Sequence, residues 1–165
     1  MRVNSAPFAW LLTAIRILMG AFFLMEAVHQ LTSDYIGGDG LEKKLQKGID
    51  TAIPPYDYLI EHVFLKIDDP LTFVVIAGEI GVGVALVLGL LTRFTAVTAL
   101  AMNVNFFLMN GLHIGSGGVD AAFIVGEMVL IACASQQALS ADSRLRRNGV
   151  YGWSFSGDAK RDPDY

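Results

Sequence analysis

Two sets of polar side chains interrupt long apolar stretches of this sequence, and these are the residues that could carry chemistry. The members of the first set are Arg16, Glu79, Asn103 and Glu127. Arg16 keeps its charge and presents a planar fork that matches a carboxylate, so we expect a buried ion pair with Glu79 or with Glu127. Two interpretations stay open. The cluster only locks the helices together, or it forms a polar pocket for a head group or a proton path.

The second set is predicted to lie near the outer membrane surface. It contains Glu26, His29, Asn110 and His113, with Asp120 close by. Glu26 and His29 share a helix face, and histidine carries protons near neutral pH, so the set predicts a pocket that binds a quinone carbonyl. The alternative is that these side chains only meet lipid headgroups. A haem or chlorophyll bound through a histidine is chemically feasible, but no spacing supports it.

Four apolar stretches must position both sets, and each is close to the length that crosses a bilayer. A hydrocarbon core of about 30 Å needs roughly 20 helical residues. The sequence therefore predicts an all-α fold: a four-helix transmembrane bundle with a partly helical outer loop between helices one and two. We expect residues 1–147 to form the membrane domain and residues 148–165 a polar cytoplasmic tail. The four stretches are Phe8–Leu31, Leu71–Leu91, Phe94–Leu112 and Val119–Ala138.

The composition agrees with a membrane domain and argues against several other classes of function. Hydrophobic residues make up 53% of the 165 residues and charged residues 17%, which is too apolar for an ordinary soluble domain. The net charge of −4 gives no basis for nucleic-acid binding. Cys133 is the single cysteine, so we predict no internal disulfide and no multi-cysteine metal or iron–sulfur site. We predict no other metal site. Gly115–Gly118 lacks the surroundings of a phosphate-binding loop and is predicted to be a tight turn between helices.

The loop charges predict the orientation of the bundle. Arg2, Arg93 and a basic C-terminal segment share one side, whereas the loop at 32–70 has eight acidic residues against four lysines. The positive-inside rule therefore places both termini in the cytoplasm and this loop outside. Within the loop, Leu41–Lys47 predicts a short amphipathic helix and Tyr58–Leu65 a second short element.

The first two apolar stretches carry further signals. Arg16 and Glu26 interrupt the first stretch, which we interpret as a retained helix rather than a secretory signal. Gly81, Ala85 and Gly89 recur at four-residue spacing on one face of the second stretch. Small residues in such a stripe allow another helix to approach closely.

The second stretch also carries a resemblance to a known family. The Gly78-Glu79 pair, the small-residue helix after it and the Leu88–Arg93 turn resemble the DoxX/DoxD-like family of four-helix membrane proteins. Arg16–Gly20 is similar to the family's first helix and Asn103–Gly111 to its third. The resemblance extends over about residues 10–147, including a basic end.

This resemblance implies a small subunit of a quinone-linked membrane redox system, such as the membrane part of thiosulfate:quinone oxidoreductase. Glu79 and Arg93 correspond to the family pattern by position. It also implies a bacterial or archaeal inner membrane, with the lipid bilayer and other subunits of a membrane complex as partners. Because the chain lacks cysteines for a redox relay, an electron donor must belong to a bound cofactor or to another subunit. The alternative is a noncatalytic accessory or structural subunit of a larger respiratory or photosynthetic complex.

Overall fold

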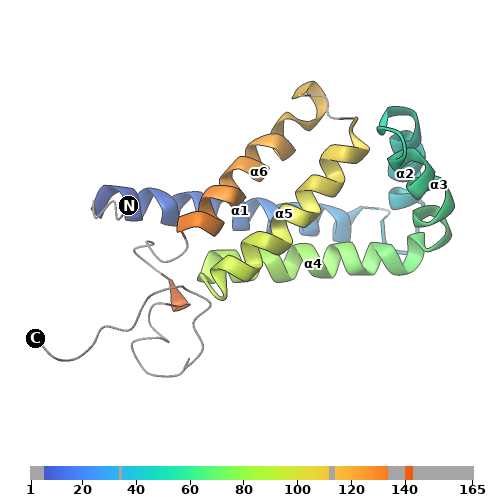
Figure 1. The fold of residues 1–165 in the computed structure, drawn as a ribbon. Helices are drawn as coiled ribbons and strands as arrows, with labels where there is room; N and C mark the ends of the chain where they lie inside the picture. Colours follow the sequence, from blue (N-terminus) through green and yellow to red (C-terminus); the bar gives the residue numbers. More distant parts are fainter. Residues whose placement is uncertain (1–5, 34, 112–113, 134–139, 143–165) are drawn as a thin grey trace, which may run out of the picture.

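The structure is a computed structural model that describes residues 6–33, 35–111, 114–133 and 140–142, with the backbone alone for residues 114–117. The regular elements in these ranges are all helical, which confirms the all-α prediction. Four of the described helices are long, and three shorter ones follow the first of them in the sequence. Figure 1 shows the arrangement of the labelled helices. The elements are α1 (Ala6–Thr32), α2 (Gly40–Thr51), α3 (Tyr56–His62), the 3-10 helix η1 (Phe64–Lys66), α4 (Asp68–Leu88), α5 (Thr92–Met109) and α6 (Ile114–Cys133).

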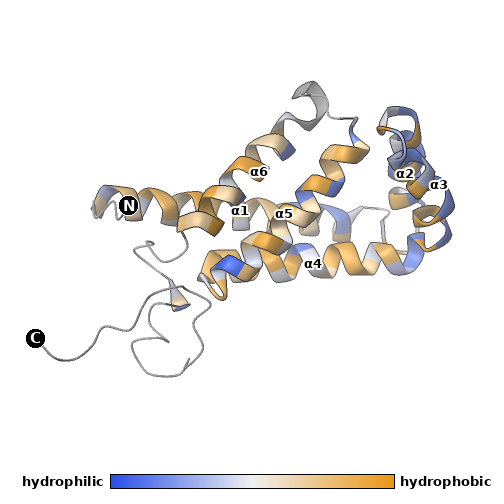
Figure 2. Cartoon of the chain, in the orientation of Figure 1, coloured by the Kyte–Doolittle hydropathy of each residue, from blue (hydrophilic) through white to orange (hydrophobic). Residues whose placement is uncertain are grey.

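Helices α1 and α4 have the length and composition of membrane-spanning helices. Only 33% of the most apolar 18-residue segment of each helix is buried inside the protein. Most of each segment therefore faces outward. The core helix of a soluble protein would bury most of it. Figure 2 shows apolar residues running along both helices. These helices indicate that the chain is a membrane protein.

The side chains are arranged inside-out compared with a soluble domain. Large apolar residues such as Leu18 on α1 and Phe73 and Val74 on α4 are exposed. Polar residues such as Thr13 and Gln30 are buried between the helices. This arrangement suits a surface that contacts lipid. Exposing apolar side chains to lipid costs no free energy, whereas exposing polar side chains to lipid is unfavourable.

One predicted turn is wrong. Gly115–Gly118 belongs to the first turns of α6, which begins at Ile114 rather than at Val119. Glycine costs only about 1 kcal/mol relative to alanine inside a helix, so a short glycine run does not prevent helix formation. Helix α5 ends at Met109, where Gly111 adopts a left-handed φ of 68° that glycine tolerates.

Helices α1 and α4 run side by side in opposite directions (Figure 1). Their close approach occurs at Gly20 and Gly83: a Cβ atom built on Gly20 would lie 2.8 Å from the carbonyl oxygen of Gly83. The predicted stripe does not form this contact. A Cβ atom on Gly81 would meet no described atom within 4 Å, and Gly89 instead ends α4 with a left-handed φ of 70°.

Helices α2 and α3 cover one end of the bundle, which we call the cap end (Figure 1). Leu41 and Leu45 are both buried, as their spacing on one helix face predicts, and they pack with Ile60 and Met109. Thr51 Oγ1 donates a hydrogen bond to the carbonyl oxygen of Met109 at 3.0 Å. The partly helical loop is therefore attached to the end of α5.

The opposite end, which we call the turn end, holds the α4–α5 connection (Figure 1). Here Asp142 Oδ1 accepts a hydrogen bond from the amide of Leu91 at 2.7 Å, and Oδ2 accepts one from Thr92 at 2.8 Å. The amide of Asp142 donates to the carbonyl oxygen of Gly89 at 3.1 Å. A carboxylate at this position satisfies amides that the first turn of α5 leaves without helical partners and complements the helix dipole.

Candidate ligand cavity at the cap end

A cavity of about 210 Å³ lies among the four long helices and α2. Its volume exceeds the roughly 150 Å³ that holds a benzene molecule in an apolar protein interior. The cavity combines residues that are far apart in the sequence, and this includes members of both predicted polar sets. Its polar lining residues are Glu26, Lys44, Glu79, Asn103, Asn110 and Asp120.

Aromatic and apolar side chains form the rest of the cavity wall. Phe22 and Phe23 come from α1, and Phe106 and Met109 come from α5. The ring of Phe22 lies 4.7 Å from that of Phe123 on α6, measured between centroids. These contacts link α1 to α6 and place flat apolar surfaces beside the polar groups.

Glu79 is the most deeply buried acid of the lining, with 3% of its surface exposed. Its Oε1 atom accepts a hydrogen bond from Gln30 Nε2 at 3.0 Å, which joins α4 to α1. Its Oε2 atom has no hydrogen-bond partner among the residues that the structure describes. A buried polar atom without a partner is uncommon in proteins and calls for a specific explanation, such as a bound ligand.

Two side-chain amides, that of Asn103 on α5 and that of Asn110 directly after α5, donate hydrogen bonds to carboxyl groups of α6. Asn103 Nδ2 donates to Glu127 Oε1 at 2.5 Å, and Glu127 is fully buried. Asn110 Nδ2 donates to Asp120 Oδ2 at 3.0 Å, closer to the cap end. Each pair ties the two helices together and directs one N–H group of the amide at a protein carboxyl group.

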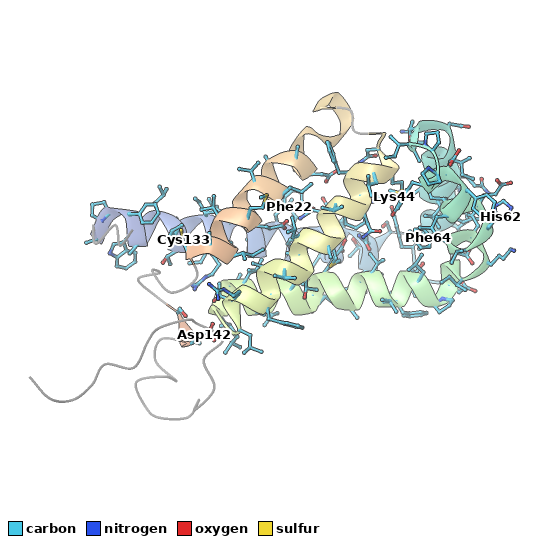
Figure 3. The ribbon with its side chains drawn as sticks, in the orientation of Figure 1. Phe22, Lys44, His62, Phe64, Cys133 and Asp142 are labelled. Atoms are coloured by element: carbon cyan, nitrogen blue, oxygen red, sulfur yellow. The ribbon has the colours of Figure 1, made fainter. Side chains whose placement is uncertain are left out.

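Lys44 brings a positive charge to the cavity from α2 (Figure 3). Its ammonium nitrogen lies 5.2 Å from the ring centroid of Phe106, a cation–π geometry. The same charge acts on the carboxyl groups of Glu79 and Asp120. Burial and the nearby negative charges of Glu26 and Glu79 raise the pKa of Tyr35, on the loop before α2, above its usual range. The surroundings of the cavity are thus predominantly acidic, with one lysine among the described lining residues.

The structure brings only some residues of the predicted outer set to the cavity. Glu26 and Asn110 line the cavity, as does Asp120. His29 is exposed and is not one of the lining residues. His113 lies outside the described residues.

The predicted charge cluster is also only partly together in the structure, because Arg16 lies away from its other members. Glu79 and Asn103 line the cavity, and Glu127 lies behind Asn103. The expected ion pair of Arg16 with Glu79 or Glu127 is wrong, because the hydrogen bonds of both acids come from amides.

Arg16 lies at the turn end instead, with 1% of its surface exposed. Its guanidinium contacts Gly89, where a Cβ atom would collide with it, and it is attracted by the charge of Asp142. Gly89 and Glu79 are ten positions apart, about 15 Å along α4. The predicted depths of Arg16 and Glu79 were counted from approximate helix ends. That counting was too coarse to show that the two side chains lie at different levels of the bundle.

Sequence reasoning missed three residues that matter here. Lys44 was expected only to be part of an outer amphipathic helix, and Gln30 and Asp142 carried no signal at all. Of the three, only Lys44 could have been identified from the sequence. It directly precedes Leu45, which the apolar spacing of α2 places on the buried face. The contacts of Gln30 and Asp142 depend on tertiary packing.

The described residues contain no group of three or more potential metal ligands among their His, Cys, Asp and Glu side chains. The cavity offers carboxylates, amides, one ammonium group and aromatic walls. These groups suit an organic molecule with a flat ring and polar substituents better than they suit a metal ion.

The helices and the cavity together define a small helical membrane protein with an internal polar site. The chain belongs to the DoxX family, whose model matches residues 11–111. The matched region contains every cavity-lining residue except Val119 and Asp120 and ends before α6, so it is shorter than the resemblance predicted from the sequence. Comparison with curated proteins and with solved structures gave no match.

Proposed function

We propose that this protein binds the headgroup of a quinone in the cavity at the cap end and serves as a small quinone-binding subunit of a membrane redox complex. The observation that carries the proposal is Glu79. Its carboxyl group is buried, lines a cavity large enough for a six-membered ring, and keeps one oxygen without a partner among the described residues, to which a hydroxyl group of the reduced ligand can donate.

The shape and lining of the cavity support this choice of ligand. A quinone headgroup is a flat ring with polar substituents at its edge, and it needs apolar walls with a few polar groups. Phe22, Phe23 and Phe106 supply the walls, and Glu79 and Lys44 supply polar groups on opposite elements, α4 and α2. A volume of about 210 Å³ accommodates the ring but not an isoprenoid tail, which must extend between the helices toward lipid.

The contacts that we propose differ in part from those predicted from the sequence. Glu26 and Asn110 remain in the proposed site because both line the cavity. Lys44 takes the place of His29 as the proposed hydrogen-bond donor, because His29 is exposed outside the cavity. The proposal therefore uses no histidine.

We further propose that all four long helices cross the membrane, with the turn end and both termini in the cytoplasm of an inner membrane. Arg93 lies at the turn end, where its Nε donates to the carbonyl oxygen of Ile131 at 3.3 Å, and its charge fits the positive-inside rule. The cap end, with α2 and α3, then faces outside. A reporter after Tyr165 should be cytoplasmic and a tag between Asp39 and Gly40 external. The reverse result would invert the orientation.

Electrons must enter through another component. Cys133 is the single thiol of the chain and lies away from the cavity lining, so the chain offers no thiol relay. A partner subunit or a further cofactor would supply this chemistry. Mass spectrometry of a gently solubilised complex should then find the chain together with a redox subunit.

The direct test is equilibrium binding of decylubiquinone to the purified full-length protein in detergent. Phe106→Ala should weaken binding about tenfold, because it removes an aromatic wall of the cavity. Phe73→Ala is the matched control, since Phe73 is exposed on the outer surface of α4. No binding by the wild type, or equal binding by both variants, would reject the cavity as a quinone site and favour a noncatalytic accessory subunit.

A further inference from the structure

We propose that the cavity binds the reduced hydroquinone form of its ligand more tightly than the oxidised quinone. This inference rests on the proposed function and concerns which redox form fits the site. It follows from an imbalance between the hydrogen-bond acceptors and donors that face the cavity.

The acceptors are numerous. Three carboxyl groups line the cavity, those of Glu26, Glu79 and Asp120. Glu79 Oε2 is buried and receives no hydrogen bond from the described part of the protein. On Asp120, Oδ2 receives the hydrogen bond from Asn110. A ligand with O–H groups therefore meets acceptors on α1, α4 and α6.

The donor side chains are Lys44, Asn103 and Asn110, and both asparagines already donate to protein carboxyl groups. Asn103 directs an N–H group at Glu127, and Asn110 directs one at Asp120. Lys44 carries the ammonium group of the lining, and this group lies over the ring of Phe106. Its charge attracts the carboxylates of Glu79 and Asp120.

The two redox forms differ in the hydrogen bonds that they can make. A quinone has two carbonyl oxygens, which only accept, whereas a hydroquinone has two hydroxyl groups, which donate. With Glu79 and a second lining acid ionised, hydroquinone can donate one hydrogen bond to Glu79 Oε2 and one to the second carboxylate. Quinone would leave the Glu79 oxygen without a donor and place carbonyl oxygens near other acceptors. Since a buried acceptor without a donor is costly, we expect hydroquinone to bind about tenfold more tightly.

The experiment compares decylubiquinone and decylubiquinol on the same full-length protein in detergent under argon, by isothermal titration calorimetry. The reduced form should have a dissociation constant about tenfold lower. Equivalently, the midpoint potential of the bound two-electron couple should rise by about 30 mV relative to the free couple.

Glu79→Gln tests the assignment, because the amide brings an N–H group to a carboxyl group whose Oε2 has no hydrogen-bond partner among the described residues. The ratio of the two dissociation constants should fall from about ten toward one. Glu61→Gln is the matched control, since Glu61 is exposed on α3, and it should keep the wild-type ratio. Asp120→Asn provides a second test if Glu79→Gln does not fold, and it should also reduce the ratio.

The outcomes separate this inference from the proposed function. Binding of quinone as tightly as hydroquinone to the wild type would overturn the inference and leave the quinone site intact. An unchanged ratio in both Glu79→Gln and Asp120→Asn would also overturn it. If neither redox form binds, the proposed function itself fails.

Discussion

At the turn end of the bundle, both carboxylate oxygens of Asp142 accept backbone amides, and the charge of Asp142 attracts the buried guanidinium of Arg16. At the cap end, Glu79 is buried almost as deeply as Arg16, but one of its oxygens has no donor within the described structure. Packing also changes along the α1–α4 pair, where the Gly20–Gly83 contact lies between the cavity and the turn end. Backbone meets backbone where Gly20 contacts Gly83, whereas the cavity leaves about 210 Å³ open nearer the cap end.

The comparison suggests a division of roles between the two ends. Protein interiors normally fill their volume and pair their polar groups, and the backbone amides of Leu91 and Thr92 at the turn end follow this rule, although the buried Thr92 Oγ1 has no hydrogen-bond partner among the described residues. Functional sites often sacrifice stability, because a binding site must keep groups available for a ligand. If this division is right, substitutions at the glycine contact and the turn end should cost stability. Substitutions at the cavity should mainly change binding.

The largest loss of stability is expected at the glycine contact. Gly20→Val would force a side chain against the backbone of Gly83 and Val87, which cannot move aside as a flexible side chain would. We expect a loss of about 3 kcal/mol or more, the upper part of the range for overpacking. Gly81→Val is the matched control on α4, with open space around it, and it should change the melting temperature little. Equal melting temperatures for the two variants would contradict this account of the α1–α4 contact.

Arg16→Leu should have the next largest effect. It removes a buried guanidinium that packs against Gly89 and takes away the positive charge that Asp142 attracts. Interactions of this kind contribute about 1.5–3 kcal/mol, so thermal unfolding in detergent should show a clear loss. Arg93→Leu is the comparison, because Arg93 is exposed where it bonds to Ile131. A smaller loss in Arg16→Leu than in Arg93→Leu would show that the buried guanidinium does not hold the turn end.

These two sites show what the sequence could predict. Hydropathy over about 20 residues predicts long apolar helices, and the i, i+4 pair of Leu41 and Leu45 predicts the buried face of α2. The close glycine contact was assigned to the wrong residues, because spacing alone does not tell which face of a helix meets its neighbour. Arg16 was placed too near Glu79, since a shift of a few residues in a helix end moves a side chain by several ångströms. Contacts between distant segments, such as Gln30 with Glu79, have no local pattern.

Asp142→Ala should cost about 1 kcal/mol, the typical contribution of a side chain that caps a helix. Its two carboxylate oxygens bond to the amides of Leu91 and Thr92, which would lose these acceptors. Asp142→Asn should lose less, because its amide oxygen can still accept one of the hydrogen bonds. If both variants unfold at the wild-type temperature, the segment at 140–142 contributes nothing to the stability of the turn end.

Tyr56→Phe should weaken the attachment of the cap by about 0.5–1.5 kcal/mol. The hydroxyl group of Tyr56 donates to Asn105 Oδ1 at 2.7 Å, and burial raises the pKa of Tyr56 above its usual range. Because the folded state favours the neutral phenol, this contribution is present below the unfolded pKa of about 10 and is lost as the pH rises through the folded value. Hydrogen exchange in α2 and α3 measured at two alkaline pH values should show the effect in the wild type and a smaller one in Tyr56→Phe. The same pH response in both proteins would exclude Tyr56 as its source.

The smallest change in stability, and the sharpest test of the comparison, is expected for Glu79→Gln. The amide oxygen can still accept the hydrogen bond from Gln30, and the Oε2 atom that is replaced has no partner among the described residues to lose. The variant also avoids the cost of burying a carboxylate. Without ligand, its free energy of unfolding should therefore lie within about 1 kcal/mol of the wild type, on the stable side. Thermal unfolding in detergent, with quinone removed by extraction, measures this difference. A loss as large as that of Asp142→Ala would mean that Glu79 supports the fold just as Asp142 does, and the two ends of the bundle would then have the same role.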